Sequence, residues 1–216
     1  MMRTKFDEQL TLLNRELIRM GAICEETIAL AAKALVSGEA ALLERIGPLT
    51  AELDQKERAV ESLCLKLLLQ QQPVACDLRH ISAALKMITD MERIGDQAGD
   101  IGEIISFLEK GAGREHPLIN EMARAAIHMV TGSVDAFVHQ DVDQARQVVA
   151  GDDVVDDYFC RVKSALISLI AEHPEEGQTA LDLLMIAKYL ERIGDHAVNI
   201  AEWVVFSVTG SHQGAC

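Results

Sequence analysis

The chain has 216 residues, of which 34 are Asp or Glu and 20 are Lys or Arg, so its formal net charge is −14. This length is enough to bury the core of one or two domains, and a negative excess of this size argues against nucleic acid as a partner. Hydrophobic residues make up 49% of the chain but aromatic residues only 4%, a balance common in helical proteins.

Three helices are predicted in the first half. Between residues 6 and 35, apolar residues recur every three or four positions, the period of a helix with one buried stripe. A second helical stretch covers about residues 40–72, where Gly47-Pro48 could interrupt it. Asp77 is expected to be the N-cap of a third helix, which continues to the glycine-rich break at 111–113.

Three further helices are predicted in the second half, over about residues 117–140, 143–172 and 178–208. No segment alternates with period two for long enough to indicate a strand. The sequence therefore predicts an all-α fold of two tandem, pseudo-symmetric antiparallel three-helix bundles. We expect residues 1–112 to form the first repeat and residues 113–216 the second.

An internal duplication supports this division. The sequence Glu-Arg-Ile-Gly-Asp at 92–96 recurs at 191–195, an offset of 99, whereas Met20 and Met122 in the first helices are 102 apart. We place the three missing residues between the first and second helices, so that the second helices also share the offset of 99. The two halves should then have the same fold. On this register the acids paired in the second helices are Asp54 with Asp153 and Glu57 with Asp156.

The repeated motif places oxygen-bearing side chains along one face of a helix. At about 100° per residue, the four in the third helix fall within an arc of roughly 80°, opposite the apolar residues. Stacked acids repel one another, and a metal ion would relieve the repulsion because hard cations prefer oxygen ligands. The residues are Glu92, Asp96, Asp100 and Glu103 in the third helix and Glu191, Asp195, Asn199 and Glu202 in the sixth.

The second helix of each half supplies more acids, which could lie beside these stripes. A solvated acidic face with ordinary surface ion pairs is the alternative interpretation. Gly95 and Gly194, which are unfavourable inside a helix, fit either a functional motif or close helix packing. The additional acids are Asp54, Glu57 and Glu61 in the first half and Asp152, Asp153, Asp156 and Asp157 in the second.

Other chemistry is sparse. The sequence contains no HExxH, GxxxxGK or GxGxxG motif and no Glu-x-x-His pair. Asp135 and His139, one helical turn apart, are interpreted as a surface pair, and His196 as an exposed histidine that could also join a site. Trp203 is a candidate contact residue or a partly buried one. With no nucleophile–base arrangement, we do not expect an enzyme.

The cysteines and the apolar runs bear on location. Five scattered cysteines without a C-x-x-C pair are typical of reduced thiols, and we expect them to be buried. The N-terminal sequence has no apolar stretch of the signal-peptide kind. We therefore expect a cytoplasmic protein that contacts a membrane only through its partners. The cysteines are Cys24, Cys64, Cys76, Cys160 and Cys216.

Taken together, these motifs resemble those of the PhoU family, which regulates phosphate uptake in bacteria. In the first half the similar segments are QQPVACDLR at 71–79 and MERIGD at 91–96. In the second half they are DVVDDY at 153–158 and LERIGDHAVNIAE at 190–202. The likeness covers nearly the whole chain and preserves the order of the six helices.

The resemblance implies a pair of three-helix bundles in which E/D-x-x-x-D patterns bind multinuclear iron or zinc clusters. This sequence departs from the pattern at Asn199 and at Arg58. The resemblance also implies an adaptor that represses the phosphate-starvation response, linking the ATPase subunit of a phosphate ABC transporter to a sensor histidine kinase. The metal ligands expected are Glu92, Asp96, Asp100, Glu191, Asp195, Asp54, Glu57, Asp153, Asp156 and Asp157.

Two other classes of protein remain as alternatives. A carboxylate-bridged di-metal enzyme would need inward-facing Glu and His side chains, and a metal-free helical scaffold would carry acids that are only solvated. The identity of the metal, the choice between monomer and homodimer, and direct binding of phosphate are left open.

Overall fold

The computed structural model describes residues 2–70, 73–109 and 116–211, which fold into helices without a β-strand in these ranges. The expected boundary between residues 112 and 113 lies outside them and stays a prediction, and Cys216 also lies outside. The elements are α1 (Met2–Ser37), α2 (Ala40–Leu43), α3 (Ile46–Gln70), α4 (Ala75–Phe107), α5 (Pro117–His139), α6 (Val142–Glu172), the 3-10 helix η2 (Pro174–Glu176) and α7 (Gly177–Thr209).

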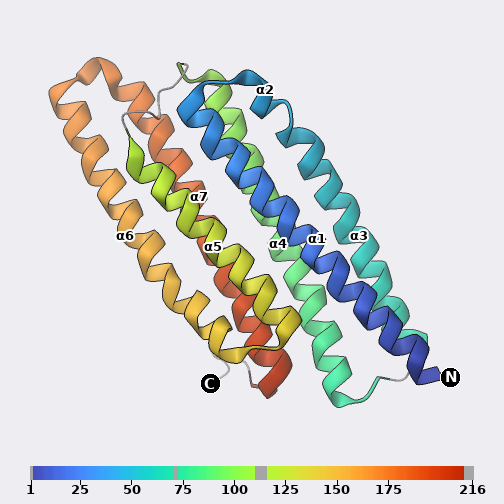
Figure 1. The fold of residues 1–216 in the computed structure, drawn as a ribbon. Helices are drawn as coiled ribbons and strands as arrows, with labels where there is room; N and C mark the ends of the chain where they lie inside the picture. Colours follow the sequence, from blue (N-terminus) through green and yellow to red (C-terminus); the bar gives the residue numbers. More distant parts are fainter. Residues whose placement is uncertain (1, 71–72, 110–115, 212–216) are drawn as a thin grey trace.

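Two three-helix bundles lie side by side, one made of α1, α3 and α4 and the other of α5, α6 and α7 (Figure 1). They contact each other along α4 and α7 and along α1 and α5. The all-α fold of two tandem three-helix bundles is therefore confirmed. In the part of the chain that the structure describes, no helix is both long and apolar enough to cross a membrane.

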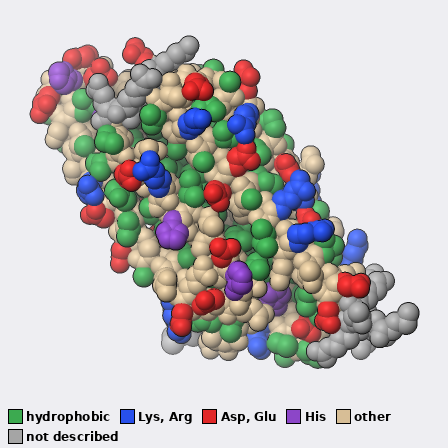
Figure 2. Space-filling view, viewed as in Figure 1, with side chains coloured by type: hydrophobic (Ala, Val, Ile, Leu, Met, Phe, Trp, Pro, Cys, Tyr) green, Lys and Arg blue, Asp and Glu red, His purple; other side chains and the backbone are tan. Residues whose placement is uncertain are grey.

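One apolar core runs through both bundles. Leu17 of α1, Met91 of α4 and Phe137 of α5 are all fully buried members of a single cluster to which every long helix contributes. Burial of apolar area is the main favourable contribution to folding, so each bundle is stabilised partly by the other. On the outer surface, acidic side chains are interspersed with basic and apolar ones on the face shown in Figure 2.

Two predicted helix boundaries are wrong. The second helical stretch is interrupted at 44–45, and Pro48 lies in the first turn of α3, where the missing N–H of proline costs no hydrogen bond. Val74 is the N-cap of α4, and Asp77 lies three residues inside the helix, where its Oδ2 accepts a hydrogen bond from the Val74 N–H at 3.3 Å. Asp77 thus stabilises the start of α4 from the first turn.

The register between α3 and α6 also differs from the prediction. Their buried residues match at an offset of 102, so Asp54 corresponds to Asp156 and Glu57 to Phe159; the pairings of Asp54 with Asp153 and Glu57 with Asp156 are wrong. The three missing residues lie after the second helix, because four residues separate α3 from α4 and only His173 separates α6 from η2. The matched buried pairs are Ile46 and Val148, Leu53 and Val155, Val60 and Val162, and Cys64 and Leu166.

The cysteines divide into two groups. Cys24 and Cys64 are buried, as expected, but Cys76 and Cys160 are exposed. The expectation was wrong for Cys160 because the 102-residue register turns it to the solvent side of α6, where α3 has the exposed Arg58.

Candidate metal centre

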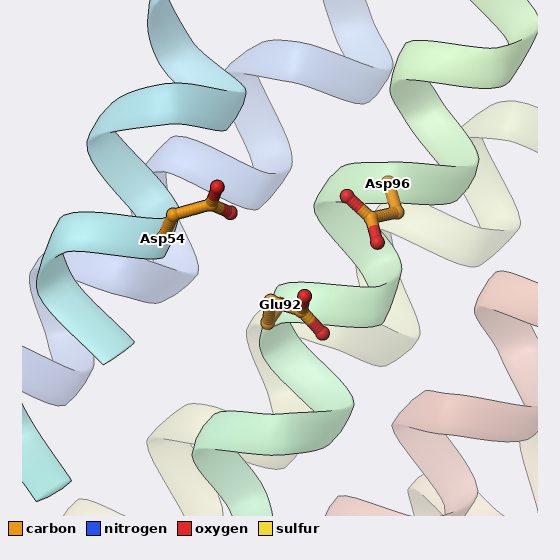
Figure 3. A group of neighbouring side chains, drawn as sticks. All are labelled: Asp54, Glu92 and Asp96. Atoms are coloured by element: carbon orange, nitrogen blue, oxygen red, sulfur yellow. The ribbon is translucent and has the colours of Figure 1, made fainter. Parts of the chain in front are cut away.

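Three carboxylates face one another between α3 and α4. Asp54 projects from α3, and Glu92 and Asp96 project from successive turns of α4 (Figure 3). One oxygen of each lies within 4.8 Å of the other two. Two oxygens bound to one ion at about 2.4 Å can be at most about 4.8 Å apart, so these three side chains, here called the first carboxylate cluster, fit a single hard cation.

Close packing of α3 on α4 brings this cluster together. A Cβ added to Gly95 would collide with Cδ2 of Leu53, and one added to Gly102 would lie 2.9 Å from Cδ1 of Ile46. Glycine inside a helix is less stable than alanine by about 1 kcal/mol, so the close approach of the two helices accounts for its presence. The packing role that the sequence left open for Gly95 is observed, and it places Asp54 next to Glu92.

Crowding raises the pKa values of these acids. Burial is the main cause for Glu92, and repulsion from Asp96, Glu57 and Asp54 adds to it. The pKa of Asp96 is raised by burial and then by Asp54 and Asp100. Burial also raises the pKa of Glu57. Each shift reflects a charged form that lacks compensation, which a bound cation would supply.

Asp100 is not part of the first carboxylate cluster, although its charge acts on Asp96. Its charge acts on Tyr189 of α7, whose pKa is raised by burial first and then by Asp100. The predicted stripe on α4 therefore splits, with Glu92 and Asp96 facing α3 and Asp100 facing the second bundle.

In the second bundle, Asp152 is the α6 acid that packs against α7. A Cβ added to Gly194 would lie 3.3 Å from its Oδ1. Burial, followed by repulsion from Asp156 and Asp195, raises the pKa of Asp152 to about 6. Its Oδ1 is buried and has no hydrogen-bond partner among the residues described.

These acids form a second carboxylate cluster, which is looser than the first. It consists of Asp152, Asp156, Glu191 and Asp195, whose charges act on one another. Within the described ranges, no three of its ligand atoms come as close as those of the first carboxylate cluster.

Two of the predicted ligands lie at the edge of this cluster, because Asp153 acts on Asp152 less than Asp156 and Asp195 do, and Asp157 is not among the charges that act on it. Asp153 and Asp157 are exposed, and Asp157 forms an ion pair with Arg161 at 3.5 Å. The corrected register explains this, because Asp156 is the α6 counterpart of Asp54.

Sequence reasoning missed a polar network between α4 and α7. Nδ1 of His196 lies 2.9 Å from Oδ1 of Asp90, and Asn199 donates to the same oxygen at 3.2 Å. The His196 side chain is only 12% exposed, so its interpretation as an exposed histidine is wrong. Asp90 could have indicated this network from the sequence, because it lies on the apolar face of α4 between Met87 and Ile94. A buried carboxylate needs a hydrogen-bond partner.

The remaining candidates have ordinary structural roles. Nδ1 of His139 contacts the backbone carbonyl of Asp135 at 2.9 Å, near the end of α5, and both residues are exposed. Their interpretation as a surface pair agrees with this position. Trp203 is partly buried and packs against the core.

The chain is similar in sequence to known proteins over nearly its whole length. A family model described as the PhoU domain matches the chain twice, over residues 17–105 and 119–204. A relative from Clostridium acetobutylicum named phosphate-specific transport system accessory protein PhoU homolog is 33% identical over 214 residues, 97% of each chain. A relative of the same name from Synechocystis is 35% identical over 98% of this chain and 94% of its own.

Solved structures agree with the fold. The crystal structure of PhoU from Pseudomonas aeruginosa matches with a TM-score of 0.88 and 30% identity, covering 95% of this chain and all of that one. The phosphate transport system regulatory protein PhoU from Streptococcus pneumoniae matches with a TM-score of 0.87 and 25% identity, covering 96% and 98%.

Proposed function

The chain belongs to the PhoU family, and from this premise we propose that it is a metal-binding accessory and regulatory protein of a phosphate transport system. The observation that supports metal binding is the first carboxylate cluster, in which Asp54, Glu92 and Asp96 meet. Among the residues described, no cation acts on Asp96, and Arg93 has the smallest of the effects on the pKa of Glu92.

The chemistry of the ligands favours some metals over others. All three ligands are carboxylates, and oxygen ligands suit hard cations, whereas zinc sites in proteins rely largely on Cys and His. Of the two metals that the family resemblance implies, iron therefore fits this set better than zinc. Asp100 and Glu57 lie close enough to influence the cluster electrostatically and are proposed as outer ligands or as neighbouring charges.

The protein would act by binding. Its proposed partners are the ATPase subunit of a phosphate ABC transporter and a sensor histidine kinase, and we place it in the cytoplasm, where both would present their soluble parts. The names of its relatives, which are accessory proteins of phosphate-specific transport systems, support this role. A di-metal enzyme is less well supported, because the acids lie on the side of α4 that faces α3 and solvent, and the sequence has no Glu-x-x-His pair.

Metal binding is tested with Asp96→Asn and with the control Asp153→Asn, which removes an exposed acid that belongs to neither the first nor the second carboxylate cluster. We expect the wild type and the control to retain iron in stoichiometric amount by elemental analysis. At a free metal concentration about 100 times Kd, the ion should stabilise the fold by about 2.7 kcal/mol. Asp96→Asn should lose both effects. Equal metal content in the two variants would contradict the assignment, and a metal-free wild type would favour a plain scaffold.

Recovery of partner proteins from membranes tests the proposed role as an adaptor. Tagged protein is incubated with membranes from cells grown with and without phosphate, and bound proteins are identified by mass spectrometry. We expect the wild type to recover the transporter ATPase or the sensor kinase more strongly from phosphate-replete cells. Recovery of neither under both conditions would overturn the proposed role.

A further inference from the structure

The second carboxylate cluster already has a cation beside it. Nζ of Lys188 on α7 forms an ion pair with Oε2 of Glu191, whose side chain is only 17% exposed. We infer that Lys188 is a built-in counter-ion that occupies the place of a metal in the second bundle, so that the two bundles are functionally unequal. This inference rests on the proposed metal binding by the first bundle.

Lys188 has no counterpart in the first bundle. At the offset of 99 that relates α4 to α7, its position corresponds to Thr89, which is exposed and uncharged. Glu92, the counterpart of Glu191, therefore lacks a lysine one turn before it. The same motif thus stands next to a neutral side chain in one bundle and next to an ammonium in the other.

Two positions of α6 near Lys188 also carry less negative charge than their counterparts in the first bundle. Phe159 and Lys163 of α6 correspond at the offset of 102 to Glu57 and Glu61 of α3. The ammonium of Lys188 lies 5.4 Å from the centroid of the Phe159 ring, and that of Lys163 lies 5.9 Å from it. An aromatic face attracts an ammonium, so the ring holds Lys188 near the cluster, in the region where the first bundle has two acids.

One potential ligand is also missing. Asn199 stands where the first bundle has Asp100, and its amide nitrogen donates to Asp90, so it is already engaged in the contact between α4 and α7. The acidic stripe on α7 therefore has one carboxylate fewer than the stripe on α4, and it has a cation of its own.

The electrostatic environments of the two central aspartates differ accordingly. Burial, Asp54 and Asp100 all raise the pKa of Asp96. The pKa of Asp195 is also raised, by burial and by Glu191, and Lys188 opposes this shift without cancelling it. A metal ion entering the second cluster would have to displace Lys188 or sit next to its charge, whereas in the described part of the chain the only cation that acts on Glu92 in the first cluster is Arg93, which has the smallest effect on its pKa.

The test uses the full chain, Mn²⁺ as the probe and equilibrium dialysis to count bound ions. In the wild type, Asp96→Asn should abolish binding and Asp195→Asn should leave it unchanged. Lys188→Thr, which introduces the residue of the first bundle, should add a second binding event that Asp195→Asn removes. Lys188→Arg is the matched control, because it keeps the charge and should add no binding.

The reciprocal change moves the cation into the first bundle. Thr89→Lys should weaken Mn²⁺ binding there by about tenfold or more, because a unit charge then lies beside the ion. If Asp195→Asn reduces binding by the wild type as much as Asp96→Asn does, or if Lys188→Thr and Lys188→Arg bind alike, the inference is wrong.

A measurement without metal separates this inference from the proposed function. In the presence of a chelator, Lys188→Thr should lower Tm relative to Lys188→Arg, and Thr89→Lys should raise Tm relative to the wild type. If these shifts occur and the wild type binds no Mn²⁺, the proposed metal binding fails but Lys188 remains the counter-ion. If the shifts are absent, the counter-ion role fails whatever the first bundle binds.

Discussion

A buried histidine, His80, connects the two bundles at the scale of a single residue. Its Nε2 lies 3.2 Å from Oδ1 of Asn14 in α1, and its ring stacks on Phe137 of α5 with the centroids 4.3 Å apart. Nδ1 is buried without a hydrogen-bond partner in the described part of the chain. Burial lowers the pKa of His80, against a smaller opposing effect of Asp77. The neutral ring, donating from Nε2, therefore fits this position.

Acid should destabilise the fold through His80. Its pKa is lower in the folded chain than the value near 6.5 of the unfolded chain, so the unfolded chain binds more protons below about pH 6.5. The contribution of His80 to the free energy of unfolding is therefore fully present above that pH, and it is lost as the pH falls towards the pKa of His80 in the folded chain. We expect His80→Gln to flatten the decrease of Tm between about pH 7.5 and about pH 5, followed by circular dichroism.

The comparison for His80→Gln is the slope of Tm against pH, since the substitution also removes a ring contact. His128→Gln, which changes an exposed histidine, should leave the slope as it is in the wild type. A slope that is the same in His80→Gln and the wild type would show that His80 does not control the acid response.

At the scale of elements, α4 and α7 contact each other through an apolar surface that contains a polar network. Asp90 accepts from Asn199 and lies 2.9 Å from His196, and the charge of Asp100 acts on Tyr189 further along the same pair of helices. Polar groups inside such a contact need complementary partners. These bonds therefore specify how the two helices align, which apolar packing alone specifies less strictly.

Removing Asp90 should weaken this contact. We expect Asp90→Ala to lower the free energy of unfolding by about 1–3 kcal/mol, because His196 stays buried without its acceptor. Urea unfolding measures the loss. Glu103→Ala, at an exposed acid of the same helix, should change stability by less than about 0.5 kcal/mol. Additive effects of Asp90→Ala and Asn199→Ala would contradict their coupling.

At the scale of the whole molecule, the shared core makes the two bundles one cooperative unit. The apolar cluster continues from α1 and α4 into α5 and α7, so neither bundle can lose its packing without exposing the other. Unfolding of the complete chain should accordingly be a single transition.

Leu17→Ala tests this cooperativity, because the change and the probe lie in different bundles. Leu17 is fully buried in the first bundle, and the only tryptophan of the chain, Trp203, lies in the second. We expect Leu17→Ala to lower the free energy of unfolding by about 2–5 kcal/mol. The urea transitions measured by Trp203 fluorescence and by circular dichroism should shift together. A fluorescence transition that stays at the wild-type midpoint would mean that the bundles unfold independently.

The sequence alone was sufficient for the helices and for their arrangement as two bundles. The apolar period from residue 6 to residue 35 and the repeated motif at 92–96 and 191–195 are local features, and they predict helices and a duplicated fold without knowledge of contacts. Glu92, Asp96 and Asp54 could be identified as candidate ligands because their residue types and spacing already indicate metal binding.

Only the tertiary structure decided which acids face one another. A helical period shows that acids share a face, but the neighbouring helix determines where that face lies. The positions of Asp152, Asp100 and His196 therefore depended on how α3, α4, α6 and α7 pack. The wrong pairing of Asp54 with Asp153 has the same origin. The sequence does not show whether the three residues are missing from the loop before α6 or from the loop after it. Leu53 packs on Gly95, and Val155 packs on Gly194 in the same way. Because buried side chains must match in space, this packing assigns the deletion to the loop between α6 and α7.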